Sequence, residues 1–485
     1  MNTGFLSEFE LEQFLNAFNY HLDNYQSYNY LQSQSNPAIG TFAYDIELIR
    51  KGILLRSALG IKTSILESGD TSIIDTYSDL YSLRKKINKL QIKPIDERTE
   101  DIIQLKKQEN ELEKTLALKS RDYRMAQEEN EIIWKEIKKN LKPGEASIEF
   151  SSFRYYNGNK STDSILYCAV LLRNHDTVPK LVYLFEESEL KKAIPISGAT
   201  NRDINYLYQS QDLYNLIWNP LDSLLNGIKN IYYAPSGLLH TVSMSAISSP
   251  DKKRLIEKYN LIQVGTTRSP ALQKEHMLRI NATVYGGIIY DTDTATIISK
   301  AARYATKEND LLAYNRAIST SNRSRFKYLP GTMEEAKLVS GKLENKNINT
   351  TLFTGTDALE ESFHVLSGSN SPSIIHLSTH GYYFPDTVCG KNIKYSTSGE
   401  MLFRYSDDPL LRSGLLMAGA NLAWKGQPIP AHMEDGILTA KEVLKMNLMN
   451  TELIVLSACQ TGQGDVKGSE GVEGLQRGFK MAGSG

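Results

Sequence analysis

Two apolar stretches near the C-terminal end of the chain decide its fold. Ser373–Gly381 reads SIIHLSTHG, and Glu452–Gly462 reads ELIVLSACQTG. Each is an apolar run of strand length that ends in a small residue and then a reactive side chain, which is followed by a glycine or a glycine-rich turn. Strands that are apolar throughout are typical of the interior of a parallel sheet covered by helices on both faces. The first run delivers His380 and the second delivers Cys459.

Strands and helices alternate regularly around these two runs. Thr332 and Glu335 have the spacing of a capping box, which predicts a helix over residues 333–343. Asp357 and Glu360 have a similar spacing before the His380 strand, and further helices are expected over residues 439–446 and 470–481. This alternation predicts α/β layers.

The preceding part of the chain divides into a β-rich and a helical region. Runs at residues 147–153, 164–172 and 181–185 predict antiparallel strands, with an α/β segment after them to about residue 290. Before residue 143, apolar residues recur at steps of three and four, which predicts amphipathic helices. Their dense lysines and glutamates are expected to form solvated faces. No full tetratricopeptide repeat pattern is visible, so these helices are interpreted as the end of such an array or as a coiled connector.

Composition excludes several classes of protein. The chain has 485 residues, a net charge of −1 and a pI of about 6.7, so it lacks the basic surplus typical of nucleic-acid binding. Its N-terminus does not resemble a signal peptide, and no run approaches the ~18 apolar residues of a membrane span. The three cysteines, Cys168, Cys389 and Cys459, are too sparse for a disulfide scaffold or a cysteine zinc site. We therefore expect a cytoplasmic protein with no metal or cofactor.

The C-terminal ends of parallel strands are where functional groups collect, and both His380 and Cys459 follow such ends. A cysteine thiol has a pKa near 8.5 and attacks as the thiolate, so it needs a partner that ionises it. An imidazole within hydrogen-bond distance does this and later protonates a leaving amine. The backbone N–H groups of Gly381 and Cys459 are candidate oxyanion donors. These residue types in this pattern indicate a cysteine-peptidase dyad.

Less specific interpretations compete with the dyad. Most unpaired cysteines are buried structural thiols, and a histidine at a strand end is often a packed turn residue. His376 lies inside its strand and is expected to be packed, Cys168 lies in a β-run, and Cys389 lies in a polar insertion. The glycine-rich loop Gly462–Ser469 follows the Cys459 strand and favours phosphate binding only weakly, because Lys467 precedes its last glycine.

Several stretches resemble the CHAT domain, a relative of caspases and separases that often follows tetratricopeptide repeats. They are His380–Gly381, Ser457–Gly462, Ala43–Arg56, Ala234–His240, Leu329–Ala336, Asp435–Ala440 and Gly474–Arg477. The resemblance covers residues 145–485 and implies a caspase-like α/β sandwich with a mainly parallel sheet, preceded by an α-helical region. It implies helices over residues 1–143, an inactive caspase-like half over 144–290 and a peptidase half over 291–485. It also implies that the dyad is His380 and Cys459, and that the family fold continues beyond the last residue given.

This sequence departs from the caspase signature, in which glutamine precedes Ala-Cys, because Ser457 stands there. Specificity for aspartate is therefore not inferred. The separase side of the clan implies a basic residue before the cleaved bond and an acidic pocket, for which the candidates are Asp386, Asp435 and Asp465.

The leading hypothesis is a cysteine endopeptidase that acts on protein substrates. The helical region upstream would control it and would bind a regulatory protein partner. A catalytically silent interaction module with the same fold is the alternative, and a nucleotide-binding α/β protein is the third hypothesis. No membrane or nucleic-acid partner is expected.

Overall fold

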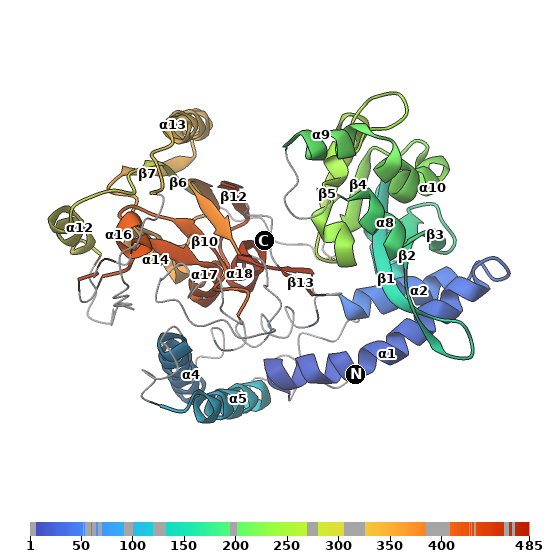
Figure 1. Cartoon of the computed structure of the whole chain (residues 1–485), viewed down its shortest axis with the longest axis horizontal. Coiled ribbons are helices and arrows are strands. Elements are labelled where there is room, and N and C mark those ends of the chain that lie inside the picture. The colour runs from blue at the N-terminus through green and yellow to red at the C-terminus, as the bar shows by residue number, and fades with distance from the viewer. Residues whose placement is uncertain are drawn as a thin grey trace. The chain divides into compact units, whose positions relative to one another are not determined.

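The structure is a computed structural model that describes most of the chain (Figure 1). The described residues are 6–51, 53, 60, 65, 70–91, 100–119, 132–194, 201–268, 280–304, 325–384, 408–425, 427, 429–430, 433–459, 465–467 and 471–484. Contacts divide the chain into two compact units. Unit 1 comprises Met1–Ser57, Arg121–Lys274 and Val466–Gly471, and unit 2 comprises Ala58–Ser120, Glu275–Asp465 and Val472–Gly485. The expected domains over residues 1–143, 144–290 and 291–485 stay a prediction.

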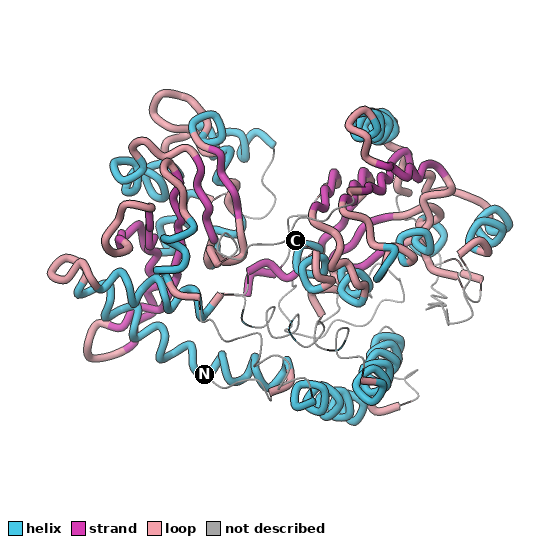
Figure 2. Tube along the Cα trace, turned by 180° about the vertical axis from the view of Figure 1, so that it is seen from behind, coloured by secondary structure: helices cyan, strands magenta, loops and turns pink. Residues whose placement is uncertain are grey.

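A five-stranded sheet with the order β3-β2-β1-β4-β5 forms the centre of unit 1. Its strands are β1 (Glu145–Tyr156), β2 (Ser161–Arg173), β3 (Lys180–Glu186), β4 (Asn230–Ala234) and β5 (Asn260–Gln263). β1, β2 and β3 pair antiparallel, as the β-rich runs separated by turn residues predict, whereas β1, β4 and β5 pair parallel. Figure 2 shows these strands in magenta, flanked by helices in cyan.

Helices pack on both faces of the unit 1 sheet because successive strand residues point to opposite sides. On one face, Leu48 of α2 and Ile137 of α7 pack with Val170 of β2; on the other, Leu171 packs in a core with Trp218. The helical elements are α1 (Glu8–Gln32), α2 (Ile39–Arg50), α7 (Trp134–Asn140), α8 (Glu187–Ala193), α9 (Asn201–Gln209), η2 (Tyr214–Trp218), α10 (Asn219–Asp222), η3 (Ser223–Leu225), η4 (Gly237–Thr241), η5 (Met244–Ala246) and α11 (Leu255–Lys258).

A four-stranded sheet with the order β12-β8-β6-β7 forms the centre of unit 2, and all its neighbouring strands are parallel. The strands are β6 (Asn281–Ile288), β7 (Asn349–Gly355), β8 (Ile374–Ser378) and β12 (Leu453–Ser457). The two runs that carry His380 and Cys459 are therefore adjacent and parallel, as expected. β12 lies at the edge of this sheet, and its Leu453 and Val455 side chains are 50% and 37% exposed.

Different helices cover the two faces of the unit 2 sheet (Figure 1). α13 (Pro330–Glu344) lies against β6 and β7, and it approaches so closely that a Cβ on Gly286 would lie 2.4 Å from the carbonyl oxygen of Thr332. The opposite face buries Ile375 and Leu377 in a core with side chains of the other helices. These helices are α14 (Glu360–His364), α17 (Ala440–Lys445) and α18 (Leu475–Met481).

Smaller elements complete unit 2. The strands β9 (Gly381–Tyr383), β10 (Ser413–Leu416) and β11 (Ile437–Thr439) form an antiparallel sheet in this unit. The short strands β13 (Asp465–Lys467) and β14 (Gly471–Glu473) pair with each other, and the division assigns Val466–Gly471 to unit 1. The helices are α12 (Thr294–Ala301), α16 (Asn421–Trp424) and η7 (Gly368–Asn370). The expected helix over residues 470–481 is thus wrong at its start, because residues 471–473 form a strand and the helix begins at Leu475.

The charged helical region contains an α-helical hairpin within unit 2. α4 (Thr71–Gln91) and α5 (Ile102–Lys119) bury Ile73, Leu80 and Leu116 between them, in agreement with the predicted apolar stripes. Arg84 of α4 forms ion pairs with Glu109 and Glu113 of α5.

The predicted α/β fold class, with a parallel sheet and helices before it, is confirmed. Among the described helices, none is both long and apolar enough to cross a bilayer.

The predicted capping box at the start of α13 is wrong. The residue before this helix is Leu329, and it makes no side-chain cap. The hydroxyl of Thr332 instead donates to the carbonyl of Leu329 at 2.7 Å and accepts the N–H of Gly287 at 3.0 Å. Glu335 is recruited by the sheet, as described below. Likewise, α14 is preceded by Leu359 and not by Asp357.

Candidate active site

The register of β8 and β12 places His380 and Cys459 at equivalent positions after the ends of two neighbouring strands. Ser378 pairs with Ser457 at the last rung of the parallel ladder, and His380 and Cys459 each follow two residues later. The N–H of Thr379 donates to the carbonyl of Ser457 at 3.3 Å, so the two chains stay together beyond the serines. Cys459 is a free, exposed cysteine in the turn that follows β12.

The His380 ring is held by a main-chain carbonyl and two aromatic rings. Its Nε2 lies 2.9 Å from the carbonyl oxygen of Lys327. Because a carbonyl only accepts, Nε2 carries a proton, and Nδ1 is the ring nitrogen that can take another one. The centroids of Tyr290 and Phe326 each lie 5.1 Å from that of His380.

The segment that carries Lys327 is itself fixed. The side chain of Asn421, at the start of α16, accepts the N–H of Phe326 at 3.1 Å and donates to its carbonyl at 3.0 Å. Asn421 is 1% exposed, and its own N–H donates to the carbonyl of Tyr290. Because this buried amide bonds both main-chain groups of Phe326, it restrains the neighbouring Lys327 carbonyl that accepts from the His380 ring.

The Tyr290 hydroxyl contacts Thr379 and the main chain of His380. Burial raises the pKa of its phenol. Thr379 donates its hydroxyl hydrogen to the carbonyl of Leu416, so the Tyr290 hydroxyl donates to Thr379 at 2.9 Å and accepts the N–H of His380 at 3.3 Å. Both main-chain groups of His380 are therefore hydrogen-bonded, its N–H to Tyr290 and its carbonyl to the N–H of Leu416.

Glu335 of α13 joins the two strand ends. One carboxylate oxygen, Oε2, accepts the hydroxyls of Ser378 at 2.7 Å and Ser457 at 3.0 Å. The other, Oε1, lies 3.1 Å from Nε2 of His376. Burial acts to raise the pKa of Glu335, but the hydrogen bonds from Ser378 and Ser457, with His376 beside them, lower it below its ordinary value. The residue therefore acts as a charged bridge between β8 and β12.

Gly381 presents its N–H on the side of β9 that faces away from β10. The N–H of Leu416 donates to the carbonyl of His380, and the N–H of Phe384 donates to the carbonyl of Arg412. In this antiparallel pair, hydrogen-bonded residue pairs alternate with pairs that have no hydrogen bonds. Gly381 opposes Leu415 in a rung without hydrogen bonds, and its N–H points outward. This orientation is what an oxyanion donor requires.

The remaining predicted residues fall in different settings. His376 is 5% exposed and Cys168 is buried, and burial raises the pKa of the Cys168 thiol; neither suits a nucleophilic site. Asp435 is 5% exposed, and its Oδ1 accepts the N–H of Ile437 at 2.9 Å. Asp386 and Cys389 lie outside the described residues, as does the side chain of Asp465.

The sequence interpretation missed the residues that support the histidine. Lys327 contributes only a carbonyl, and Asn421 and Tyr290 lie far from His380 in sequence, so no local pattern marks them. Glu335 did have a signal, since it lies in a stretch that resembles the CHAT family, but its spacing suggested a helix cap.

This parallel sheet, with a histidine and a cysteine after neighbouring strands, defines an α/β protein with a caspase-like architecture. The model of the CHAT domain family matches residues 208–485, more than half of the chain, so the chain belongs to the CHAT domain family, which is related to cysteine peptidases. The match begins within α9, so the strands β1 to β3 and the stretch Ala43–Arg56 lie outside it. No curated protein matches the chain.

Proposed function

We propose that this chain is a caspase/separase-like cysteine endopeptidase that hydrolyses peptide bonds in protein substrates, with His380 and Cys459 as its dyad. The observation that carries the proposal is the register of β8 and β12. Their last paired residues are Ser378 and Ser457, and His380 and Cys459 each follow two positions later in the sequence. Cys459 is the nucleophile, and its exposure in a turn is consistent with access by an extended polypeptide.

His380 acts as base and then as acid. Because the Lys327 carbonyl keeps a proton on Nε2, Nδ1 takes the proton of the Cys459 thiol. The thiolate then attacks the substrate carbonyl carbon and forms a tetrahedral adduct. When the C–N bond breaks, the imidazolium gives its proton to the leaving amine, which leaves a thioester on Cys459. Water adds to this thioester as His380 removes one of its protons, and release of the carboxylic acid restores the thiol.

Backbone donors stabilise the oxyanion in this mechanism. The outward N–H of Gly381 is one candidate and the N–H of Cys459 is the other. Glu335 is proposed as a positioning residue, because it holds Ser378 and Ser457 on one oxygen and so fixes the spacing of the strand ends.

The specificity pocket is proposed to be acidic and to receive a basic side chain. The burial of Asp435 and its bond to Ile437 favour a structural role for that residue. The candidates that we retain are Asp386 and Asp465.

The helices before the peptidase region are proposed to regulate it and to bind the regulatory protein partner. The α4–α5 hairpin belongs to the same compact unit as the parallel sheet, which supports a direct influence on that sheet.

The proposal is tested by comparing the purified full chain with Cys459→Ala and His380→Ala on a peptide library derived from a cell lysate, with new termini read by mass spectrometry. Cleavage by the wild type should fall to background in both variants, and the cleaved bonds should follow basic residues. Cys389→Ala and the exposed His175→Ala are the matched controls and should cleave normally.

Alkylation provides a readout that needs no substrate. Iodoacetamide should label Cys459 in preference to Cys389, and His380→Ala should slow the labelling of Cys459 by more than tenfold, because the thiolate loses its partner. Cleavage that persists in Cys459→Ala would rule out the dyad. Absence of cleavage by the wild type, together with protein capture that Cys459→Ala retains, would favour the interaction module, and thermal stabilisation by ATP would favour nucleotide binding.

A further inference from the structure

A second cluster of metal-ligating side chains lies at α14 and the loop before β11. Glu360 and His364 are one helical turn apart on α14, and Glu434 comes from that loop. One ligand atom from each of the three lies within 4.8 Å of the other two. Glu360 is 1% exposed and Glu434 is 9% exposed, while His364 is half-buried. The cluster shares no residue with the dyad.

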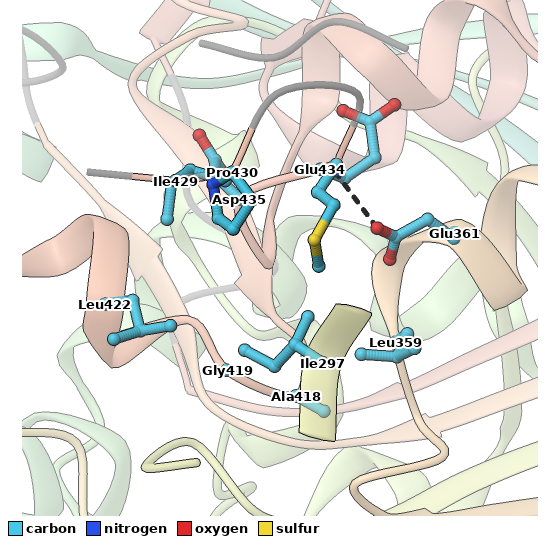
Figure 3. Close-up of a pocket in the computed structure, with 11 residues that line it drawn as sticks. Ile297, Leu359, Glu361, Ala418, Gly419, Leu422, Ile429, Pro430, Glu434 and Asp435 are labelled. Carbon is cyan, nitrogen blue, oxygen red and sulfur yellow. Dashed lines mark hydrogen bonds between the residues drawn. The ribbon is translucent and has the colours of Figure 1, made fainter. Parts of the chain in front are cut away.

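Glu434 is the member that calls for a ligand. The residue is nine-tenths buried, and among the described residues its carboxylate makes no hydrogen bond or ion pair, although its oxygens keep some contact with solvent. Figure 3 shows this carboxylate turned away from the neighbouring pocket, while the main-chain N–H of Glu434 donates to Glu361 at 3.0 Å. A buried carboxylate without a partner is costly unless it is neutralised or bound to a cation.

The charges around Glu434 are mostly negative. Burial, followed by the Glu360 carboxylate, raises the pKa of Glu434 to about 9, and Glu442 of α17 and Asp435 act in the same direction. His364 opposes them. Lys445 of α17 also lies nearby, and burial lowers its pKa to about 8. The cluster therefore has an excess of acidic groups over bases.

Two hydrogen bonds hold the ligand set in place. Oε2 of Glu360 accepts the N–H of Gly436 at 2.8 Å, which leaves Oε1 facing His364 at 3.4 Å. Gly436 has a φ of 77°, and a Cβ there would lie 2.8 Å from the nitrogen of Ala420, so only glycine fits this turn. Together with the bond from Glu434 to Glu361, these contacts fasten the loop to α14. Such outer contacts orient ligands in metal sites.

We propose that Glu360, His364 and Glu434 bind a divalent transition-metal ion of the Zn²⁺ class. An imidazole with two carboxylates suits Zn²⁺ better than Mg²⁺ or Ca²⁺, which prefer oxygen ligands alone. Three protein ligands leave a further position to water. The ion would fasten the loop before β11 to α14, and this inference does not depend on the peptidase proposal.

The test uses the full chain, stripped with EDTA, dialysed and titrated with ZnCl₂ by calorimetry and by thermal unfolding. One Zn²⁺ per chain and a higher unfolding temperature are expected, with no shift from MgCl₂ or CaCl₂ at the same concentration. Glu434→Gln and His364→Ala should each weaken Zn²⁺ binding by more than tenfold. His175→Ala and Glu344→Gln, which change exposed residues of the same types, should bind as the wild type does.

Glu434→Gln also controls for misfolding, because it removes the charge while keeping the shape. In EDTA the glutamine variant should be at least as stable as the wild type at neutral pH, because burying an amide costs less than burying a carboxylate.

Zn²⁺ binding that is absent, or that is unchanged in both Glu434→Gln and His364→Ala, would overturn the assignment. So would equal stabilisation by MgCl₂, since the imidazole would then have no role in ion selection.

Discussion

In unit 1, the parallel ladder between β1 and β4 ends at a buried ion pair, whereas in unit 2 the parallel ladder between β8 and β12 ends at two hydroxyls followed by an exposed thiol. Glu149 is the last paired residue of β1 in that ladder. Its Oε2 binds Lys51 at 2.7 Å, and its Oε1 accepts the N–H and the hydroxyl of Thr267. Lys51 and Glu149 are 1% and 0% exposed on their side chains.

The difference shows what a strand end needs for chemistry. Lys51 also donates to the carbonyls of Phe150 and Ala234, so three acceptors surround its ammonium group. An ammonium has three donors, and here all are used inside the protein. In unit 2 the carboxylate of Glu335 joins the ends of β8 and β12, and Cys459 beyond them stays exposed. One end is built as a closed structural centre, and the other keeps a reactive group accessible.

The largest expected effect is the loss of the closed centre. Lys51→Ala should lower the free energy of unfolding by about 3–5 kcal/mol, because Glu149 would stay buried without its partner. Chemical denaturation measures this. Lys191→Ala breaks a pair with Glu187 in which the lysine side chain is 62% exposed, and it should cost less than about 1 kcal/mol. A similar small loss for Lys51→Ala would contradict the view that unit 1 depends on this ion pair.

The next effect concerns the bridge in unit 2. Glu335→Ala should cost about 1–3 kcal/mol, because the buried hydroxyl of Ser378 loses its acceptor. It should also lower kcat more than KM and slow the alkylation of Cys459, whereas the exposed Glu334→Gln should change neither. Unchanged alkylation in a folded Glu335→Ala would show that the bridge does not position the dyad.

The pH dependence has a definite sign at Glu335. Since its pKa is lowered on folding, its contribution to stability is present above the ordinary value of 4.5 and is lost as the pH falls through the folded pKa. Glu335→Gln should remove that contribution, so its difference from the wild type should shrink in acid. Denaturation curves at neutral and acidic pH test this; a difference that stays constant would contradict it.

The smallest effect is expected at Tyr290. Tyr290→Phe keeps the ring beside His380 but removes the hydroxyl that serves Thr379 and the N–H of His380. The loss should be about 0.5–1.5 kcal/mol. Cleavage should slow through kcat while KM is kept. Tyr233→Phe, which removes a hydroxyl bound to Gln263 in unit 1, is the matched control and should leave cleavage unchanged.

The sequence predicts the elements whose signal is local. The apolar runs that became β8 and β12 have strand length and end at turn residues. Burial between helices explains why β8 is apolar throughout, whereas β12 lies at the edge of the sheet with Leu453 and Val455 exposed, so the expected interior position is wrong for that strand. The stripes of α4 and α5 are local in the same way. Because the ends of these strands are marked by local sequence, His380 and Cys459 could be predicted as candidate active-site residues.

Contacts between distant segments were beyond reach from one sequence. Glu335 has the spacing of a capping residue. Only the packing of α13 on the sheet shows that the hydroxyls of two serines donate to its carboxylate. The pair of Lys51 with Glu149 and the cluster of Glu360 with Glu434 join residues that only the fold brings together. Periodicity gives no information on such pairings.

The carbonyl of Lys327 has a consequence for genetics. The group that orients the His380 ring belongs to the main chain, so no substitution of the Lys327 side chain deletes it. On the proposed mechanism, a saturation scan for loss of function would score His380 and Cys459 as essential and residue 327 as tolerant. The third participant would be visible only to chemistry that alters the backbone itself, such as replacement of the amide at this position by an ester.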